Sequence, residues 1–174
     1  MRRLSALLIL IALGAANPSA MASESGPGGR DRVRAMVVEE ARDMRFAVSL
    51  ALAVAQAESD FDPMAESRVG ARGVMQIMPA TALDEYGIPP DMLWNSRVNI
   101  RLGIHFLQRL IRRYGGRTDL ALSYYNGGSA VGDLPGARVM PATFDYVRRV
   151  KSLQREYQRS MWSGEYLAWM RTAQ

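Results

Sequence analysis

The chain has 174 residues, no cysteine, one histidine and a formal net charge of +5. Without cysteine it forms no disulfide and carries no lipid on an N-terminal cysteine, and with a single histidine we expect neither a metal site nor a cofactor. The charge is modest and no dense basic stripe is interleaved with aromatic residues, which argues against nucleic-acid binding.

The N-terminus has the pattern of a signal peptide. Arg2 and Arg3 precede the apolar run 4–16, which is shorter than the roughly 20 residues needed to span a bilayer. Ala20 and Ala22 place small residues where signal peptidases require them, so we expect cleavage after Ala22. We therefore expect an exported, monomeric protein, periplasmic in a cell with two membranes. The alternative is a buried N-terminal helix, which would leave the two arginines without a purpose.

The remainder has the size of one domain. We expect a disordered lead-in at 23–30, a helical domain at 31–160 and an aromatic tail at 161–174. Apolar spacing and capping residues predict six helices in chain order, and no strand of useful length. They are a helix capped by Asp31, then 46–58, a short helix from 79, 96–114 capped by Asn95 or Ser96, 120–126, and 141–159.

The helix predicted over 46–58 is apolar on nearly every side, since only Ser49 and Gln56 are polar between Phe46 and Ala57. This pattern is typical of a buried central helix. Glu58 ends the helix among apolar neighbours, and both burial and the helix dipole raise the pKa of a carboxyl there. A carboxyl that stays protonated near neutral pH can act as a general acid. The alternative is an ordinary solvated glutamate at a helix end.

Three sequence blocks resemble the signature of the soluble lytic transglycosylases, glycoside hydrolase family 23. Residues 57–82, AESDFDPMAESRVGARGVMQIMPATA, match its long first block. Residues 121–128, ALSYYNGG, resemble the pattern A-x-x-Y-N-A-G, and residues 141–147, PATFDYV, resemble P-E-T-x-x-Y-V. The blocks occur in the family's order.

The resemblance implies a mainly α fold of the lysozyme-like α+β superfamily. It also implies cleavage of the β-1,4 bond between N-acetylmuramic acid and N-acetylglucosamine in peptidoglycan. Water takes no part, because the muramyl C6 hydroxyl closes onto C1 and leaves a 1,6-anhydro end. Glu58 would serve first as acid and then as base. The N-acetyl oxygen of the substrate would stabilise C1, so that no second carboxylate is needed.

The same resemblance implies substrate contacts for six further residues. In the family the serine lies near the catalytic glutamate, the glutamine and methionine line the cleft, the Tyr-Asn pair faces the muramyl sugar, and the last tyrosine lies close to the carboxyl. The matching residues here are Ser67, Gln76, Met78, Tyr125, Asn126 and Tyr146. Simple packing in the core is the alternative for Tyr146 and Met78.

The chain departs from the family pattern at two positions. Ala142 stands where the third block usually has glutamate, and Asp145 is the candidate to replace it. Gly127 stands where the second block usually has alanine.

Two other functions remain open at this stage. A hydrolytic lysozyme would need a second carboxylate to position water, for which Asp60 and Asp62 are the candidates. A catalytically weak protein that binds peptidoglycan during assembly is favoured by Ala142 and opposed by Glu58 and Ser67. By analogy with small one-domain transglycosylases, we expect the partners to be glycan strands and a secretion, conjugation or flagellar machine.

Two features outside the blocks have structural interpretations. His105 shares a helix face with charged residues and is predicted to lie at the surface. Trp162, Tyr166 and Trp169 recur at helical spacing, and we expect this stripe to fold back on the domain. Docking of a partner or a membrane surface is the alternative.

Overall fold

A computed structural model describes residues 28–164, 166 and 168. The predicted signal peptide, residues 23–27 of the lead-in and Trp169 lie outside the described residues. The described part is mainly helical, as predicted, and its extended pairing consists of two isolated antiparallel bridges, Glu66 with Arg72 and Arg72 with Ile77.

Within residues 28–164, five α-helices make up the body of the domain, and four shorter helical turns connect them. The α-helices are α2 (Gly29–Asp43), α3 (Val48–Ser59), α4 (Ser96–Arg113), α5 (Thr118–Gly127) and α6 (Phe144–Trp162). The turns are a π-helical one at Thr81–Glu85 and 3-10 helices at Pro90–Trp94, Gly128–Val131 and Pro141–Thr143.

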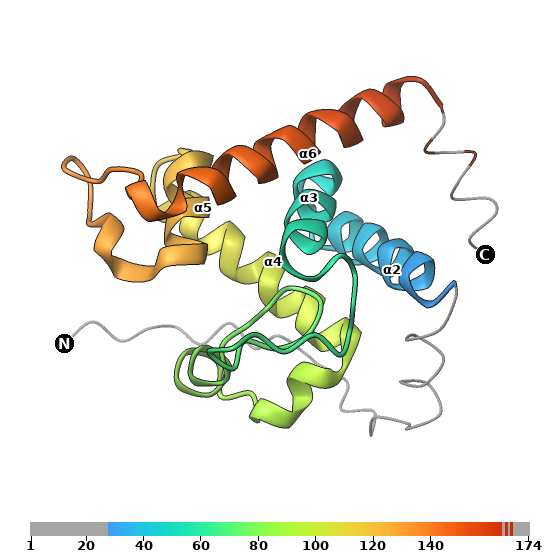
Figure 1. Ribbon diagram of the computed structural model, residues 1–174, viewed down its shortest axis with the longest axis horizontal. Helices are drawn as coiled ribbons and strands as arrows, with labels where there is room; N and C mark the ends of the chain where they lie inside the picture. The colour runs from blue at the N-terminus through green and yellow to red at the C-terminus, as the bar shows by residue number, and fades with distance from the viewer. Residues whose placement is uncertain (1–27, 165, 167, 169–174) are drawn as a thin grey trace.

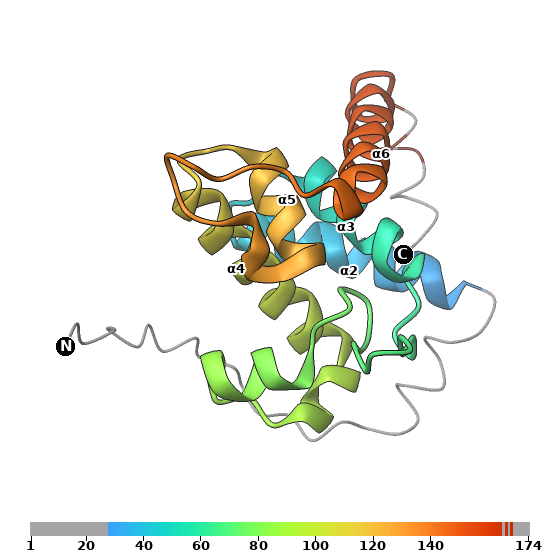
Figure 2. The same cartoon turned by 60° about the vertical axis from the view of Figure 1, so that its left-hand side comes forward.

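The elements form a bundle with a loop region beside it. Helix α3 packs against α2 and α6, and α4 packs against α2 and α5. Figure 1 shows α6 along one edge of the molecule, with α3 next to it and the segment that follows α3 on the other side of the bundle. Figure 2 shows α4 running from this loop region into the bundle. The central helix thus delivers its C-terminal end to the place where the two parts meet.

The predicted central helix is confirmed as the core of the fold. Residues 50–55 of α3 are between 0 and 3% exposed. Apolar residues cover every side of this segment, so it can bury against helices on both flanks. Asp60 follows in the left-handed conformation, which ends the helix directly after Glu58 and Ser59.

Helix boundaries differ from expectation mainly at α2. The helix is capped by Gly28 and not by Asp31, which lies inside its first turn. The N-cap of α4 is Asn95, whose side chain accepts a hydrogen bond from the Val98 N–H at 3.2 Å, as predicted. Two left-handed glycines, Gly115 and Gly116, follow α4 as expected.

A buried carboxylate joins α2 to α4. Glu40 is 0% exposed and accepts hydrogen bonds from the guanidinium groups of Arg97 and Arg101. A buried charge is costly unless it is paired, and the two arginines supply that pairing. This explains why an acidic residue occupies the apolar face of α2.

Two surface predictions need correction. His105 is half-buried, because its ring packs edge-on against Tyr86 with the centroids 5.5 Å apart. The aromatic stripe does not fold back as a unit: Tyr166 is 4% exposed and belongs to the core, whereas Trp162 is 91% exposed. Trp162 lies on the side of α6 that points away from the bundle. In the part of the chain described, no helix is both long and apolar enough to cross a bilayer.

Helix α4 approaches the loop after α3 closely at a glycine. A Cβ atom on Gly103 would lie 2.6 Å from Cβ and 2.8 Å from Cγ of Met75, so the contact requires glycine. We predict that Gly103→Ala lowers the free energy of unfolding by about 1–2 kcal/mol, the overpacking cost outweighing the gain in helix propensity.

Urea denaturation measures this effect. Gly136→Ala is the matched control, since its nearest atom would be the Asp133 carbonyl oxygen at 3.8 Å, and it should change stability by less than about 0.5 kcal/mol. A stabilised Gly103→Ala variant would show that helix propensity alone governs this position.

Candidate active site

The carboxyl of Glu58 is hydrogen-bonded to a tyrosine that lies 88 residues further along the chain. The Tyr146 hydroxyl, on α6, donates a hydrogen bond of 2.5 Å to Oε1 of Glu58. Because α6 packs along α3, a residue on its first turns reaches the end of the central helix. The structure therefore brings together Glu58 and Tyr146, two residues singled out in different sequence blocks.

Burial raises the pKa of Glu58 from 4.5 to about 7. The Tyr146 hydrogen bond and the positive charge of Arg149 act in the opposite direction, since both stabilise the carboxylate. The pKa of Tyr146 is itself raised well above 10 by burial and by the charge of Glu58, so the hydroxyl keeps its proton. Glu58 is thus balanced between its acid and base forms near neutral pH.

A buried side chain of α4 anchors the loop that follows α3. Asn99, on α4, is 0% exposed and makes three hydrogen bonds. Its Oδ1 accepts from the Met75 N–H at 2.7 Å, and its Nδ2 donates to the carbonyls of Arg72 at 2.8 Å and Leu93 at 3.0 Å. The turn beneath this side chain requires glycine, because a Cβ on Gly73 would lie 2.5 Å from Nδ2 of Asn99.

Two more helices hold the same loop. The Tyr125 hydroxyl, on α5, donates to the Met75 carbonyl at 2.7 Å, and the Ser59 hydroxyl, next to Glu58, donates to the Val74 carbonyl at 2.8 Å. Burial raises the pKa of Tyr125 well above 10, with the charge of Glu58 the next cause, which places this ring in the electrostatic neighbourhood of the carboxyl. The loop therefore has a fixed position relative to Glu58.

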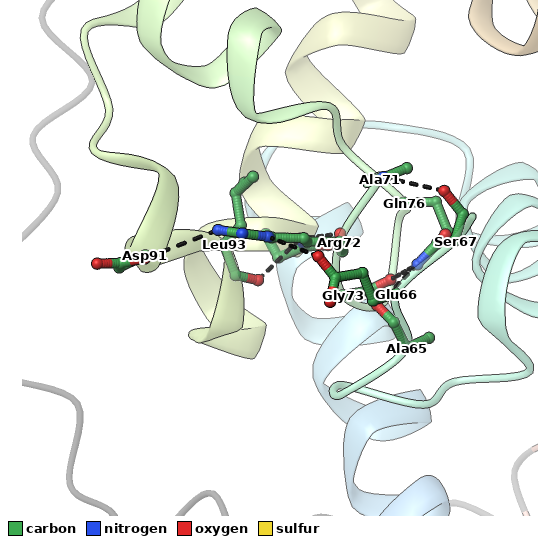
Figure 3. Close-up of polar contacts among 10 residues, drawn as sticks. Ala65, Glu66, Ser67, Ala71, Arg72, Gly73, Gln76, Asp91 and Leu93 are labelled. Carbon is green, nitrogen blue, oxygen red and sulfur yellow. Dashed lines mark hydrogen bonds and ion pairs between the residues drawn. The ribbon is translucent and has the colours of Figure 1, made fainter. Parts of the chain in front are cut away.

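Two predicted contact residues serve the loop itself (Figure 3). Gln76 has the left-handed conformation, and its Nε2 donates to the carbonyls of Ala65 and Gly73, both at 3.0 Å. The Ser67 hydroxyl accepts a hydrogen bond from the Ala71 N–H at 2.9 Å. Both side chains are half-buried and brace the segment between Ala65 and Gln76. Their contacts with substrate stay predictions.

The remaining predicted contact residues are open to solvent. Met78 follows the braced loop and is 39% exposed, so it is not the core residue considered as an alternative. Asn126 is exposed in the last turn of α5, one residue beyond Tyr125. Both positions are accessible to a ligand.

The candidates for a second catalytic carboxylate have other partners. Asp60 is exposed and accepts a hydrogen bond of 2.5 Å from Arg30. Asp62 accepts the Met64 N–H at 2.9 Å, which confirms that it belongs to a turn. No carboxylate of the described residues is among the groups that shift the pKa of Glu58.

The structure accounts for one of the two departures from the family pattern. A Cβ on Gly127 would lie 2.7 Å from the Thr143 methyl, so glycine is required against this threonine. Ala142 is exposed, and Asp145 is exposed and pairs with Arg148. No contact of either residue with Glu58 is present in the described part of the chain.

Sequence reasoning missed Asn99 and Arg149. A signal for Asn99 exists, because it lies one turn before Gly103 on the apolar face of α4, where an amide is unusual. Arg149 has no such signal, since it is one of several basic residues on α6 and acts on Glu58 only through the packing of two helices.

Comparison with known sequences identifies the family. The sequence model of the transglycosylase SLT domain matches residues 36–133, more than half of the chain. The chain belongs to this family. The matched range contains α3, the braced loop, α4 and α5.

Similar proteins are much longer than this chain. A soluble lytic murein transglycosylase of Salmonella typhimurium is 38% identical over 87 residues, which cover 46% of this chain and 14% of that protein. For its counterpart in Escherichia coli K12 the identity is 37% over the same length and coverage. The chain thus spans about one seventh of the curated relatives that it matches.

Solved structures share the fold. An inactive glutamate-to-glutamine variant of the lytic transglycosylase Slt from Pseudomonas aeruginosa is 31% identical, with a TM-score of 0.63, over 74% of this chain and 24% of that one. The 70 kDa soluble lytic transglycosylase in complex with bulgecin A is 27% identical, with a TM-score of 0.60, over 72% and 24%. These similarities confirm the expected fold class.

The role of Asn99 can be tested against a second asparagine of the same helix. We predict that Asn99→Ala lowers the free energy of unfolding by about 3 kcal/mol or more, because the buried Met75 N–H and Leu93 carbonyl lose their partner. Asn95→Ala removes the half-buried N-cap of α4 and should cost about 1 kcal/mol. Equilibrium urea unfolding of both variants gives the comparison, and equal costs would refute the special role of Asn99.

Because burial and the Tyr146 hydrogen bond shift the pKa of Glu58 in opposite directions, removing the hydrogen bond should change this pKa in a predictable direction. Removing the hydroxyl in Tyr146→Phe takes away a group that stabilises the carboxylate, so the pKa of Glu58 should rise above about 7. NMR titration of the glutamate carboxyl carbons measures it. Tyr125→Phe is the control, because its hydroxyl bonds to Met75 and leaves the Glu58 contact intact. An unchanged or lower pKa in Tyr146→Phe would contradict the assignment.

Proposed function

We propose that the chain is a peptidoglycan lytic transglycosylase with Glu58 as its single catalytic carboxyl. The observation that carries the proposal is the position of the Glu58 carboxyl at the end of the buried central helix, where the Tyr146 hydroxyl donates a hydrogen bond of 2.5 Å to it and burial raises its pKa to about 7. A group with this pKa is populated in both protonation states near neutral pH, which suits a residue that must donate and then accept a proton.

In the first step Glu58 donates its proton to the glycosidic oxygen that leaves as the N-acetylglucosamine hydroxyl. The bond from C1 to this oxygen breaks, and the N-acetyl oxygen of the muramyl residue stabilises C1. The carboxylate that forms is stabilised by the Tyr146 hydroxyl and by the charge of Arg149. Both groups are present before the reaction, so they need no reorganisation to meet the new charge.

In the second step the Glu58 carboxylate takes the proton of the muramyl C6 hydroxyl. The C6 oxygen then forms a bond to C1, which yields the 1,6-anhydro end and restores protonated Glu58. We assign Ser67, Gln76 and Met78, with Tyr125 and Asn126, to the walls that orient the sugars. Their positions on the braced loop and on α5 support this assignment.

The pairing of nearby carboxylates favours transglycosylation over hydrolysis. A hydrolytic enzyme of the two-carboxylate type needs a second acidic group beside the bond. Asp60 pairs with Arg30, and Asp62 accepts a backbone N–H in a turn. Both carboxylates therefore have partners other than a water molecule beside the glycosidic bond. The murein transglycosylase names of the relatives, and the inactive glutamate-to-glutamine variant of one of them, add support. Export to the periplasm follows from the predicted signal peptide and is part of the proposal.

The test is the chemistry of the products. The mature protein, incubated with purified peptidoglycan, should release muropeptides with 1,6-anhydro ends, which mass spectrometry finds lighter by one water than hydrolytic products. Glu58→Gln should reduce their rate of formation by about 100- to 10,000-fold. Glu156→Gln, a matched change at an exposed carboxylate of α6, should retain full activity.

Other outcomes would replace the proposal in distinct ways. Reducing muramyl ends would make the protein a hydrolase. Peptidoglycan that binds to the wild type and to Glu58→Gln, without products from either, would assign the chain to the binding proteins of wall assembly.

A further inference from the structure

The outer side of α6 presents a row of cations with an exposed aromatic residue at each end. Members recur every three or four residues, so they lie on one side of the helix. All are exposed, with Phe144 at 53% and Trp162 at 91%. This set, which we call the α6 stripe, consists of Phe144, Arg148, Lys151, Arg155, Arg159 and Trp162.

The stripe has an excess of positive charge. No acidic residue belongs to it, and among the described residues no carboxylate forms an ion pair with Lys151, Arg155 or Arg159. Arg148 pairs with Asp145, but both side chains are more than three-quarters exposed, so water screens this contact. The helix therefore carries a field that attracts anions.

The stripe lies opposite the buried side of the helix. Val147, Val150 and Tyr157 face the core, and the stripe residues point away from it. Figure 1 shows α6 lengthwise at the margin of the molecule. A flat surface can contact an exposed helix of this kind along much of its length.

A shallow, open hollow lies at the C-terminal end of the stripe, where two arginines lie next to the Trp162 side chain. The described residues that line it are Arg155, Gln158, Arg159, Trp162 and Ser163, and its volume is about 650 Å³. Two guanidinium groups can hold a phosphate, and the indole lies beside them.

We propose that the α6 stripe docks this protein on an anionic lipid surface. Indole rings favour the interface between headgroups and acyl chains, and Trp162 is the most exposed of the large apolar side chains described. Each Lys or Arg near an anionic bilayer increases binding by about fivefold. Cations between two exposed aromatic residues therefore fit a membrane surface better than a soluble acidic protein.

Docking through the α6 stripe would leave the candidate active site at Glu58 accessible. Tyr146 is on the side of α6 that faces Glu58, roughly opposite the stripe. The Glu58 carboxyl would be separated from the lipid by the width of the helix, about 10 Å. A protein attached in this way keeps its site free, while the docking itself does not depend on the proposed catalysis.

Vesicle co-sedimentation tests the proposal with the mature chain. We expect binding to vesicles of 30% phosphatidylglycerol in phosphatidylcholine and none to pure phosphatidylcholine, with a strong loss at high salt. Arg155→Gln combined with Arg159→Gln should weaken the affinity by about 30-fold. Trp162→Ala should weaken it several-fold at unchanged salt dependence.

Matched variants distinguish binding through the α6 stripe from binding through the overall positive charge of the protein. Arg32→Gln combined with Arg138→Gln removes the same charge from exposed positions on α2 and on the loop before α6, and should bind within about twofold of the wild type. Glu58→Gln should bind the anionic vesicles as well as the wild type does. This result would show that vesicle binding does not depend on the proposed catalytic activity. Thermal unfolding should be unchanged in the stripe variants, because their side chains are exposed.

Three results would overturn the proposal. They are equal binding of the two arginine double variants, absence of wild-type binding to the anionic vesicles, and stripe-dependent binding to soluble polyglutamate with none to vesicles. The last would assign the stripe to an acidic polymer or protein.

Discussion

The three hydrogen bonds of Asn99 are the constraint on which the site depends. One amide side chain satisfies the Met75 N–H and two carbonyls in a space where water has no access. Its neighbours are adapted to it: Gly73 lacks the Cβ that would collide with it, and Gly103 lets α4 approach Met75. The Tyr125 hydroxyl then holds the Met75 carbonyl, which belongs to the next peptide group. Without this anchoring, the loop opposite Glu58 would have backbone polar groups but no defined position.

At Glu58, opposing effects set the pKa of the carboxyl. Burial favours the protonated acid, whereas the Tyr146 hydroxyl and Arg149 favour the carboxylate. Burial alone would shift the pKa further up, and the two stabilising groups alone would shift it down. Their combination produces a pKa of about 7, which is what one residue needs in order to serve both steps of an anhydro-forming reaction. Glu40, which is 0% exposed, is different: two arginines pair with its carboxylate directly, and this contact joins α2 to α4.

Helix α6 connects the two proposals. Its inner side contributes Tyr146 to the carboxyl and Tyr157 to α3, where the hydroxyl donates to Gln56 at 2.6 Å. Its outer side presents cations and Trp162. The same helix would thus stabilise the ionised state of the site and orient it with respect to an anionic surface. Since the two sides are separated by the helix itself, substitutions on one need not disturb the other.

The sequence by itself determined the helical class, the buried central helix and the position of Glu58 at its end. These depend on apolar spacing and on capping residues, which act within one or two helical turns. Motif resemblance added Tyr146 and the loop residues as members of one site. Tertiary structure alone decided that Gln76 and Ser67 brace the loop, that His105 is half-buried against Tyr86, and that Trp162 points to solvent while Tyr166 enters the core. It also decided the roles of Asn99 and Arg149. These outcomes depend on which helices come into contact, and local sequence spacing contains no information about contacts between residues far apart in the chain.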